Sequence, residues 1–346
     1  MLPPTAHRLA LLPLVLLAAC ASSPPTPTVS PDVPPPPAAS PAPVTPLLAN
    51  AAAPGSAAPP TPTEVVIDSS RETVRSTAVW VARSIDGWFG NRPFEAGGKV
   101  SNGQLDLSVL KREGETTNVG LRINARFALP NIDKLSYVFV GRDDEREVVA
   151  DTPGALARRD RLLATSSRER SFFAGLGRSL DDAVDFKIGV RGAFKIYAQA
   201  RAQQVWQLGE GDAVEARQTF FWTVADRLGS TSTVSYGHEF SPSLTLRWHN
   251  TATITQELPK FVWASSLGGY QDFGMQRLLS LEALVNGQQG SGVDALDYGV
   301  QARWEQPVYQ SWLIGGIAVG HFWPRPDAQT ARHAAWALGL NLKMRF

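Results

Sequence analysis

The chain has 346 residues, of which 43% are hydrophobic, and its 33 basic and 32 acidic side chains leave a formal net charge of +1. This near balance of charge does not favour a nucleic-acid partner. A single cysteine excludes a disulfide framework within the chain.

The first predicted element is an export signal in residues 1–19. A basic start precedes an apolar run that ends in Leu17-Ala18-Ala19-Cys20. The run is too short to cross a hydrocarbon core, which needs roughly 20 helical residues. The pattern resembles the lipobox of bacterial lipoproteins. The resemblance implies a diacylglycerol on the Cys20 thiol, an acyl chain such as palmitate on its amine, and the lipoprotein processing machinery as a partner. An ordinary signal peptide with an incidental cysteine is the alternative.

Residues 20–63 are expected to be a disordered linker that follows the lipidated cysteine. They consist mainly of Pro, Ala, Ser and Thr, and Asp32 is the single charged residue between positions 21 and 63. Such a composition cannot bury a core, and proline favours an extended, semi-rigid chain. Ala21 is not the aspartate with which bacterial lipoproteins remain in the inner membrane. The linker would therefore tether the chain to lipid of the outer membrane.

Segment 64–96 is interpreted as a lead-in with one amphipathic helix at about 68–92. We expect the helix to begin near Asp68-Ser69-Ser70, which can cap it, and to end at Gly90. Apolar residues recur there at three- and four-residue spacing: Val74, Ala78, Val81, Ile85, Trp88 and Phe89. The helix could pack against a periplasmic rim, plug a lumen, or contact the membrane surface. The sequence leaves these three placements open.

From residue 97 to 346 the apolar period changes from helical to two. In residues 118–129, for example, Val119, Leu121 and Ile123 alternate with Gly120, Arg122 and Asn124. Three features distinguish these segments from those of a soluble sandwich. They are ten to fifteen residues long, close to the 9–11 that a tilted membrane-spanning strand needs. Every second segment ends at an aromatic residue: Phe127, Trp206, Phe240, Phe273, Trp304 and Phe346. The prolines are expected between segments: Pro130, Pro153, Pro242, Pro259, Pro307, Pro324 and Pro326.

The predicted fold is therefore a closed antiparallel transmembrane β-barrel of about fourteen strands. The strands are expected at 99–112, 117–129, 135–142, 168–178, 183–192, 194–207, 213–225, 229–240, 243–257, 261–273, 276–289, 294–306, 309–323 and 332–346. An even number places both ends of the barrel chain in the periplasm. The turn between Arg191 and Phe194 is weakly marked, so twelve strands is the competing count. The longest connection, about 143–167, is expected to be an extracellular loop.

The last segment carries a pattern that resembles the signal by which outer-membrane barrels are recognised for assembly. Apolar residues occupy alternate positions up to the terminal phenylalanine: Trp336, Leu338, Leu340, Leu342, Met344 and Phe346. The resemblance implies the barrel assembly machinery as a partner and the bacterial outer membrane as the location.

The side of each strand opposite the apolar residues is expected to line a lumen. The candidate lining residues are Arg122, Arg126, Arg191, Lys195, Arg201, Arg217, Arg247, Arg303, Glu215, Glu282 and Glu305. An excess of basic residues would favour anionic solutes. Alternatively, the basic and acidic side chains pair across the lumen and fill it.

Two functions follow from this reading. One is a passive channel for small polar or anionic solutes, and the other is a structural or assembly-partner barrel with a closed lumen. A lipid-modifying enzyme is a remote third, because His249-Asn250-Thr251 has threonine where outer-membrane lipases resemble one another in having serine. No catalytic or cofactor site is expected, and His238, His321 and His333 lack metal-ligand spacing. Gly287, Gly290 and Gly292 are expected to serve a hairpin loop. The oligomeric state cannot be read from the sequence.

Several short stretches resemble those of a proteobacterial family of outer-membrane barrels. They are Asp86-Gly87-Trp88-Phe89-Gly90, Leu129-Pro130-Asn131, Gln218-Thr219-Phe220-Phe221-Trp222, Trp312-Leu313 and Phe322-Trp323-Pro324. The resemblance covers residues 86–346 and excludes the linker. It implies the barrel architecture and no particular activity.

Overall fold

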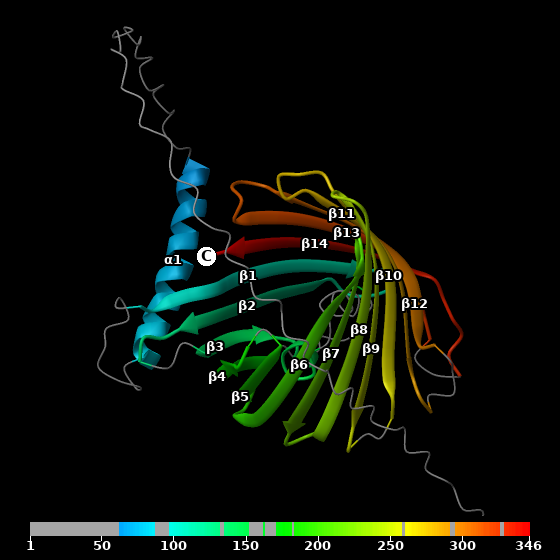
Figure 1. Ribbon diagram of the computed structural model, residues 1–346. Coiled ribbons are helices and arrows are strands. Elements are labelled where there is room, and N and C mark those ends of the chain that lie inside the picture. Colours follow the sequence, from blue (N-terminus) through cyan, green and yellow to red (C-terminus); the bar gives the residue numbers. More distant parts are fainter. Residues whose placement is uncertain are drawn as a thin grey trace, which may run out of the picture. The chain divides into compact units, whose positions relative to one another are not determined.

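The computed structural model describes residues 62–86, 97–131, 135–151, 162, 171–181, 183–257, 260–290, 295–325 and 329–346. Cys20 and almost all of the predicted linker lie outside these ranges. In the described part, fourteen antiparallel strands form a closed barrel in which strands adjacent in sequence pair and β1 pairs with β14 (Figure 1). The predicted fold class is confirmed, with fourteen strands rather than twelve.

The strands agree with the predicted segments to within a few residues at each end. They are β1 (Lys99–Arg112), β2 (Asn118–Ala128), β3 (Ser136–Asp143), β4 (Ser171–Ser179), β5 (Val184–Arg191), β6 (Lys195–Gly209), β7 (Asp212–Thr223), β8 (Arg227–Ser241), β9 (Leu244–Thr255), β10 (Val262–Asp272), β11 (Leu278–Gln288), β12 (Asp297–Pro307), β13 (Leu313–Pro324) and β14 (Ala335–Arg345). Pro307 and Pro324, expected between strands, are instead the last residues of β12 and β13. A strand end tolerates proline more readily than a strand interior.

The alternation of side chains gives the barrel an apolar outer face and a polar lumen. Large apolar residues are exposed on one side of every strand except β3, including Leu107, Val119, Leu121, Phe186, Ile188, Phe220, Val234, Leu267, Leu281, Val300, Ile317 and Leu338. Residues on the other side are buried and often polar, including Asp106, Asp185, Gln199, Thr219, Thr233, Ser266, Glu282 and Gln301. This distribution is the reverse of a soluble protein and matches a barrel surrounded by hydrocarbon.

The two ends of the barrel differ in the length of their connections. The end at which Phe346 lies, here the C-terminal rim, has short connections at 129–135, 180–183, 210–211, 242–243, 273–277 and 308–312. The opposite rim carries the longest connection, residues 144–170, between β3 and β4. The turn predicted between Arg191 and Phe194 is present, and Gly192 and Phe194 both adopt positive φ there, between β5 and β6. Left-handed backbone at that point closes a turn that residue types alone mark poorly.

Aromatic side chains gather on the outer face near both rims. Phe273 and Trp304 lie 5.4 Å apart, ring centre to ring centre, near the C-terminal rim, where Trp206 and Phe240 are also exposed. Near the opposite rim, Tyr298 stacks on Trp323 at 5.4 Å. Two such belts flank the hydrocarbon zone of membrane barrels.

Helix α1 (Pro62–Asp86) packs against the outer face of the barrel at the C-terminal rim (Figure 1). Ile67 and Val74 contact the cluster of Trp312, Leu313 and Met344. Further along the helix, Ala78 and Ala82 pack on Ala125, Phe127, Leu129 and Val138. The helix therefore crosses the β14–β1 closure, and its described side chains do not plug the lumen. Of the three placements left open, packing at this rim is the one observed.

Two details of the helix differ from expectation. It begins at Pro62, inside the predicted linker, rather than near the Asp68-Ser69-Ser70 caps. Proline suits a first helical turn, because the amide it lacks would have no helical partner there. Asp68 instead accepts a hydrogen bond from the Tyr309 hydroxyl at 3.1 Å. The helix ends at Asp86, and the predicted end at Gly90 lies outside the described residues. No helix of the described residues is both long enough and apolar enough to cross a membrane.

Candidate functional site: the lumen

The predicted lining residues all occupy positions on the lumen side of their strands. Arg122 and Arg126 lie on β2, Arg191 on β5, Lys195 and Arg201 on β6, Arg217 and Glu215 on β7, Arg247 on β9, Glu282 on β11, and Arg303 and Glu305 on β12. The structure does not bring them to one point. Arg122, Arg126, Arg201 and Arg217 join charged networks on the β1–β7 side, whereas Arg303 and Glu305 pair with each other at 3.4 Å.

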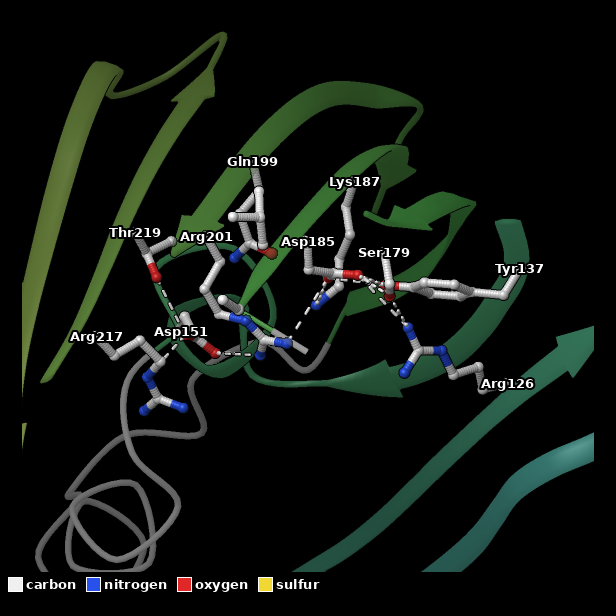
Figure 2. Close-up of polar contacts among 12 residues, drawn as sticks. Arg126, Tyr137, Asp151, Ser179, Asp185, Lys187, Gln199, Arg201, Arg217 and Thr219 are labelled. Carbon is white, nitrogen blue, oxygen red and sulfur yellow. Dashed lines mark hydrogen bonds and ion pairs between the residues drawn. The ribbon is translucent and has the colours of Figure 1, made fainter. Parts of the chain in front are cut away.

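Asp185 is the centre of the first network (Figure 2). Its carboxylate accepts hydrogen bonds from the Tyr137 hydroxyl at 2.8 Å and from the Ser179 hydroxyl at 2.8 Å. Three cations surround the same group: Arg126 at 3.5 Å, Lys187 at 3.7 Å and Arg201 at 3.8 Å. Asp185 is only 4% exposed. One buried carboxylate thus holds three basic side chains against the wall.

Asp151 is the centre of the second network, and it belongs to the β3–β4 connection rather than to a strand (Figure 2). Its carboxylate lies 3.1 Å from Nε of Arg217 and 3.7 Å from Arg201, and it accepts a hydrogen bond from Thr219 at 3.1 Å. The amide of Gln199 also donates to the carbonyl of Val149 at 2.7 Å. These contacts dock the start of the connection onto β6 and β7.

Arg122 is the centre of the third network, in which one guanidinium group lies close to three carboxylates. It lies 3.0 Å from Asp106 on β1, 3.1 Å from Asp143 at the end of β3, and 3.3 Å from Glu147. Glu147 belongs to the short helix α2 (Glu145–Val148), which begins the β3–β4 connection. The charges on this wall are therefore paired, but cations predominate around Asp185 and acids around Arg122.

The β3–β4 connection was expected to be an extracellular loop, yet its described residues lie in the lumen. Val149 and Ala150 are buried in a cluster with inward-facing aromatic residues: Tyr137, Phe139, Phe173, Tyr197 and Phe221. Leu162 packs against the other side of the barrel, on Leu284, Ala318, Phe322 and Ala337. Burial of these apolar side chains favours the inward position over a solvated one. The connection thus contacts both walls and narrows the lumen.

The wall formed by β8–β12 is lined mainly by uncharged polar groups. The hydroxyls of Thr231 and Thr253 are 2.9 Å apart, and Ser235 Oγ lies 2.6 Å from Nδ1 of His249. Glu282 accepts hydrogen bonds from Tyr270 and Gln301. His249 and Thr251 both face the lumen, and Thr251 contacts Thr233 on β8.

A cavity of ≈ 1210 Å³ remains between the walls and the connection. Its lining includes the basic residues Arg122, Arg126, Lys187, Arg201, Arg303 and Lys343 and the acidic residues Asp106, Asp143, Asp144, Glu147 and Asp185. A charged cavity of this size can hold a small polar solute or ion.

The histidines and glycines outside these networks lie apart from one another. His238 contacts Asp212 on the outer face at 2.7 Å, and His321 lies near Trp323 and Trp336 at the opposite rim. Within the described ranges, no group of three or more potential metal ligands occurs. Gly290 has a positive φ of 76° and serves a turn, Gly287 lies under Trp263, and Gly292 is outside the described residues.

Sequence reasoning missed Asp151 as a lumen residue. Its one signal is the apolar run Val148-Val149-Ala150 that precedes it within a highly charged connection. An apolar run in an otherwise solvated loop indicates a contact that the loop must make.

No family model matches the chain, and no curated protein matches its sequence. Among solved structures, the outer membrane channel DcaP of Acinetobacter baumannii has 9% identity and a TM-score of 0.45, over 73% of this chain and 98% of its own. The anion-selective porin from Comamonas acidovorans has 8% identity and a TM-score of 0.42, over 72% and 100%. OmpT of Vibrio cholerae has 12% identity and a TM-score of 0.40, over 72% and 98%. These likenesses concern the barrel alone.

Proposed function

We propose that this chain is a bacterial outer-membrane barrel that acts as a passive, constricted channel for small polar solutes, with a preference for anions. The observation that carries the proposal is a charged cavity of ≈ 1210 Å³ inside a closed barrel. The barrel's outer face is mainly apolar and bounded by aromatic residues at both rims. An apolar exterior and a polar interior are what a solute path across a membrane requires.

The preference for anions follows from the distribution of charge on the lumen side. Arg126, Lys187 and Arg201 share the single carboxylate of Asp185, so this part of the wall carries more positive than negative charge. Lys343 and Arg303 line the same cavity from β14 and β12. The acids around Arg122 oppose this effect locally. Selectivity is therefore expected to be moderate.

Conductance of the purified full chain in planar lipid bilayers tests the proposal. We expect discrete openings and, under a KCl gradient, a reversal potential on the anion-selective side. Folded protein that shows heat-modifiable migration but no conductance would contradict the channel. It would support the alternative of a structural or assembly-partner barrel, which the contacts of Leu162 and Asp151 with two different walls favour.

The proposal includes a lipid anchor at Cys20, with the barrel termini on the periplasmic side. The residues that support it are the lipobox-like Leu17-Ala18-Ala19-Cys20 and the absence of any second cysteine. The short connections of the C-terminal rim match the periplasmic end of outer-membrane barrels. Mass spectrometry of the mature N-terminus should show an acylated cysteine, whereas an unmodified terminus at or beyond Ala21 would contradict the anchor.

A further inference from the structure

The outer face of the barrel is not uniformly apolar. On β6–β10, six of the outward positions carry uncharged polar side chains, here called the polar outer patch: Gln204, Gln218, Ser230, Ser232, Asn250 and Ser265. Strand pairing fixes their direction, because Gln218 lies opposite Ser232 and next to the exposed Phe220, while Asn250 lies opposite Ser265 and Val234. These residues therefore face the same side as the apolar surface.

The outward positions of the remaining strands are mainly apolar. Exposed side chains there include Leu281 on β11, Val300 on β12, Ile317 on β13, Leu340 on β14, Leu107 on β1 and Leu121 on β2. The polar outer patch is thus a local feature of one side of the barrel. Placing a polar group against hydrocarbon costs free energy unless the group forms hydrogen bonds.

The patch residues satisfy part of their hydrogen-bonding capacity among themselves. Gln218 donates to Ser230 at 2.6 Å and accepts from Ser232 at 2.6 Å. Ser265 donates to Asn250 at 2.8 Å and accepts from the Trp248 indole at 3.0 Å. An amide has two donor and two acceptor sites, so these bonds do not exhaust Gln218 or Asn250.

The shape around the patch favours close contact with another barrel. Small residues alternate with the polar ones on this face: Ala200 and Ala202 on β6, Ala216 on β7 and Ala252 on β9. Beside them lies a hollow of ≈ 610 Å³ lined by Phe186, Ile188, Ala198, Phe220, Trp222 and Leu228. Small residues let backbones approach closely, and hydroxyl and amide side chains can bond across the contact, a combination that is typical of contacts between transmembrane helices.

We propose that the polar outer patch is the interface through which copies of this chain associate in the membrane. The inference rests on the proposed outer-membrane location. A second copy is the partner that the chemistry fits, because uncharged amides and hydroxyls supply donors and acceptors together and so complement an identical surface. An acyl chain would fill the hollow but would offer no hydrogen bond to the remaining donor and acceptor sites of Gln218 and Asn250.

Crosslinking of variants that add one cysteine to the natural Cys20 tests the interface in outer-membrane fractions. Ser232→Cys lies within the patch, and Val300→Cys is the matched control, because Val300 faces outward on β12 and is 51% exposed. The full chain with only its natural Cys20 is the background control. One added thiol per chain allows a short bis-maleimide to join two chains, so we expect a product at twice the chain mass for Ser232→Cys and monomer for Val300→Cys. Equal crosslinking of both, or a product with a different protein, would overturn the proposal.

A second measurement does not depend on where the cysteine lies. In nanodiscs, native mass spectrometry should show an oligomer for the unaltered chain and monomer for the double variant Gln218→Leu and Ser232→Leu, with heat-modifiable migration retained. A monomeric unaltered chain would overturn the interface. Absence of the chain from the outer-membrane fraction would overturn the proposed function and this inference together. If the unaltered chain did not conduct but Ser232→Cys still crosslinked, only the proposed channel would be contradicted.

Discussion

Asp151, in the connection between β3 and β4, lies 3.1 Å from Nε of Arg217 on β7 and so ties a loop to the barrel wall. Both side chains are mostly buried. Asp151→Asn would remove the charge that Arg201 and Arg217 share, at a cost to loop docking of about 1–3 kcal/mol. We expect larger single-channel conductance with more frequent fluctuation, measured in planar bilayers.

Glu257→Gln is the matched control for Asp151→Asn. It makes the same change of charge in the pair of Arg227 and Glu257, whose side chains are 72% and 60% exposed. Exposed pairs of this kind contribute about 0–1 kcal/mol. The control should conduct like the unaltered chain, and identical traces from both variants would mean that Asp151 does not hold the constriction.

Asp185→Asn should destabilise the barrel and increase its preference for anions. The change leaves Arg126, Lys187 and Arg201 without their common carboxylate, and removal of one member of a buried ion pair costs about 3–5 kcal/mol. We expect a lower unfolding midpoint in urea and a larger anion-side reversal potential. Asp181→Asn makes the same charge change at an exposed turn, where asparagine can still accept the bonds from Ala183 and Val184. An equal shift in both variants would show that Asp185 has no special role.

The barrel could be predicted from the sequence because the alternation of apolar and polar residues is a local pattern, and in a strand it places the two kinds of side chain on opposite faces. Leu338, Leu340 and Leu342 alternate with polar or small residues, and they are exposed on the outer face as that pattern requires. The position of Asp151 could not be predicted in the same way. Its partners Arg201 and Arg217 lie on later strands, and only the closed barrel brings them near the connection.

The helix shows a second limit of sequence reasoning. The spacing of its apolar residues predicts an amphipathic helix but not the surface that the helix covers. An apolar helix face can pack equally well on a barrel rim, inside a lumen or on a membrane. Met344 at the end of β14 and Phe346 just after it show the consequence. Met344 and Phe346 were expected to face lipid, whereas the structure packs them in the clusters that include α1.

Ala82→Leu should loosen α1 without opening the barrel. Ala82 is 0% exposed in the contact with Phe127 and Leu129, so a larger side chain there is expected to cost about 1–3 kcal/mol. Faster amide exchange across residues 62–86 should follow, measured by hydrogen exchange with mass spectrometry. Ser76→Leu adds a similar side chain at an exposed position of the same helix and should leave exchange nearly unchanged. Equal exchange in the two variants would argue against tight packing of the helix.

Gly103→Ala should disturb the end of the last strand. The amide of Phe346 donates to the carbonyl of Gly103 at 3.1 Å, and a Cβ at Gly103 would lie 2.6 Å from the Phe346 ring. Gly269→Ala is the matched control, since a Cβ at that strand glycine would meet nothing within 4 Å. We expect lower outer-membrane yield for Gly103→Ala and for deletion of Phe346, by heat-modifiable migration, and normal yield for the control. Unchanged yield after deletion of Phe346 would contradict its role as an assembly signal.

Leu340 and Asn341 are adjacent on β14 and face opposite sides of the barrel. Leu340 is 47% exposed on the outer face, whereas Asn341 lines the lumen cavity. An arginine facing lipid near mid-membrane costs about 2–4 kcal/mol, because its charge must leave water, but a hydrated lumen tolerates charge. Leu340→Arg should therefore lower the unfolding midpoint in denaturant. Asn341→Arg should change the midpoint little, because the side chain opposite it on β13 is only the hydrogen of Gly316, and it should shift the reversal potential further toward anions. Because both variants introduce the same residue one position apart, each controls for the other. Equal destabilisation would indicate a core packed on both faces of the strand, and the reverse order would mean that the outer face and the lumen had been exchanged.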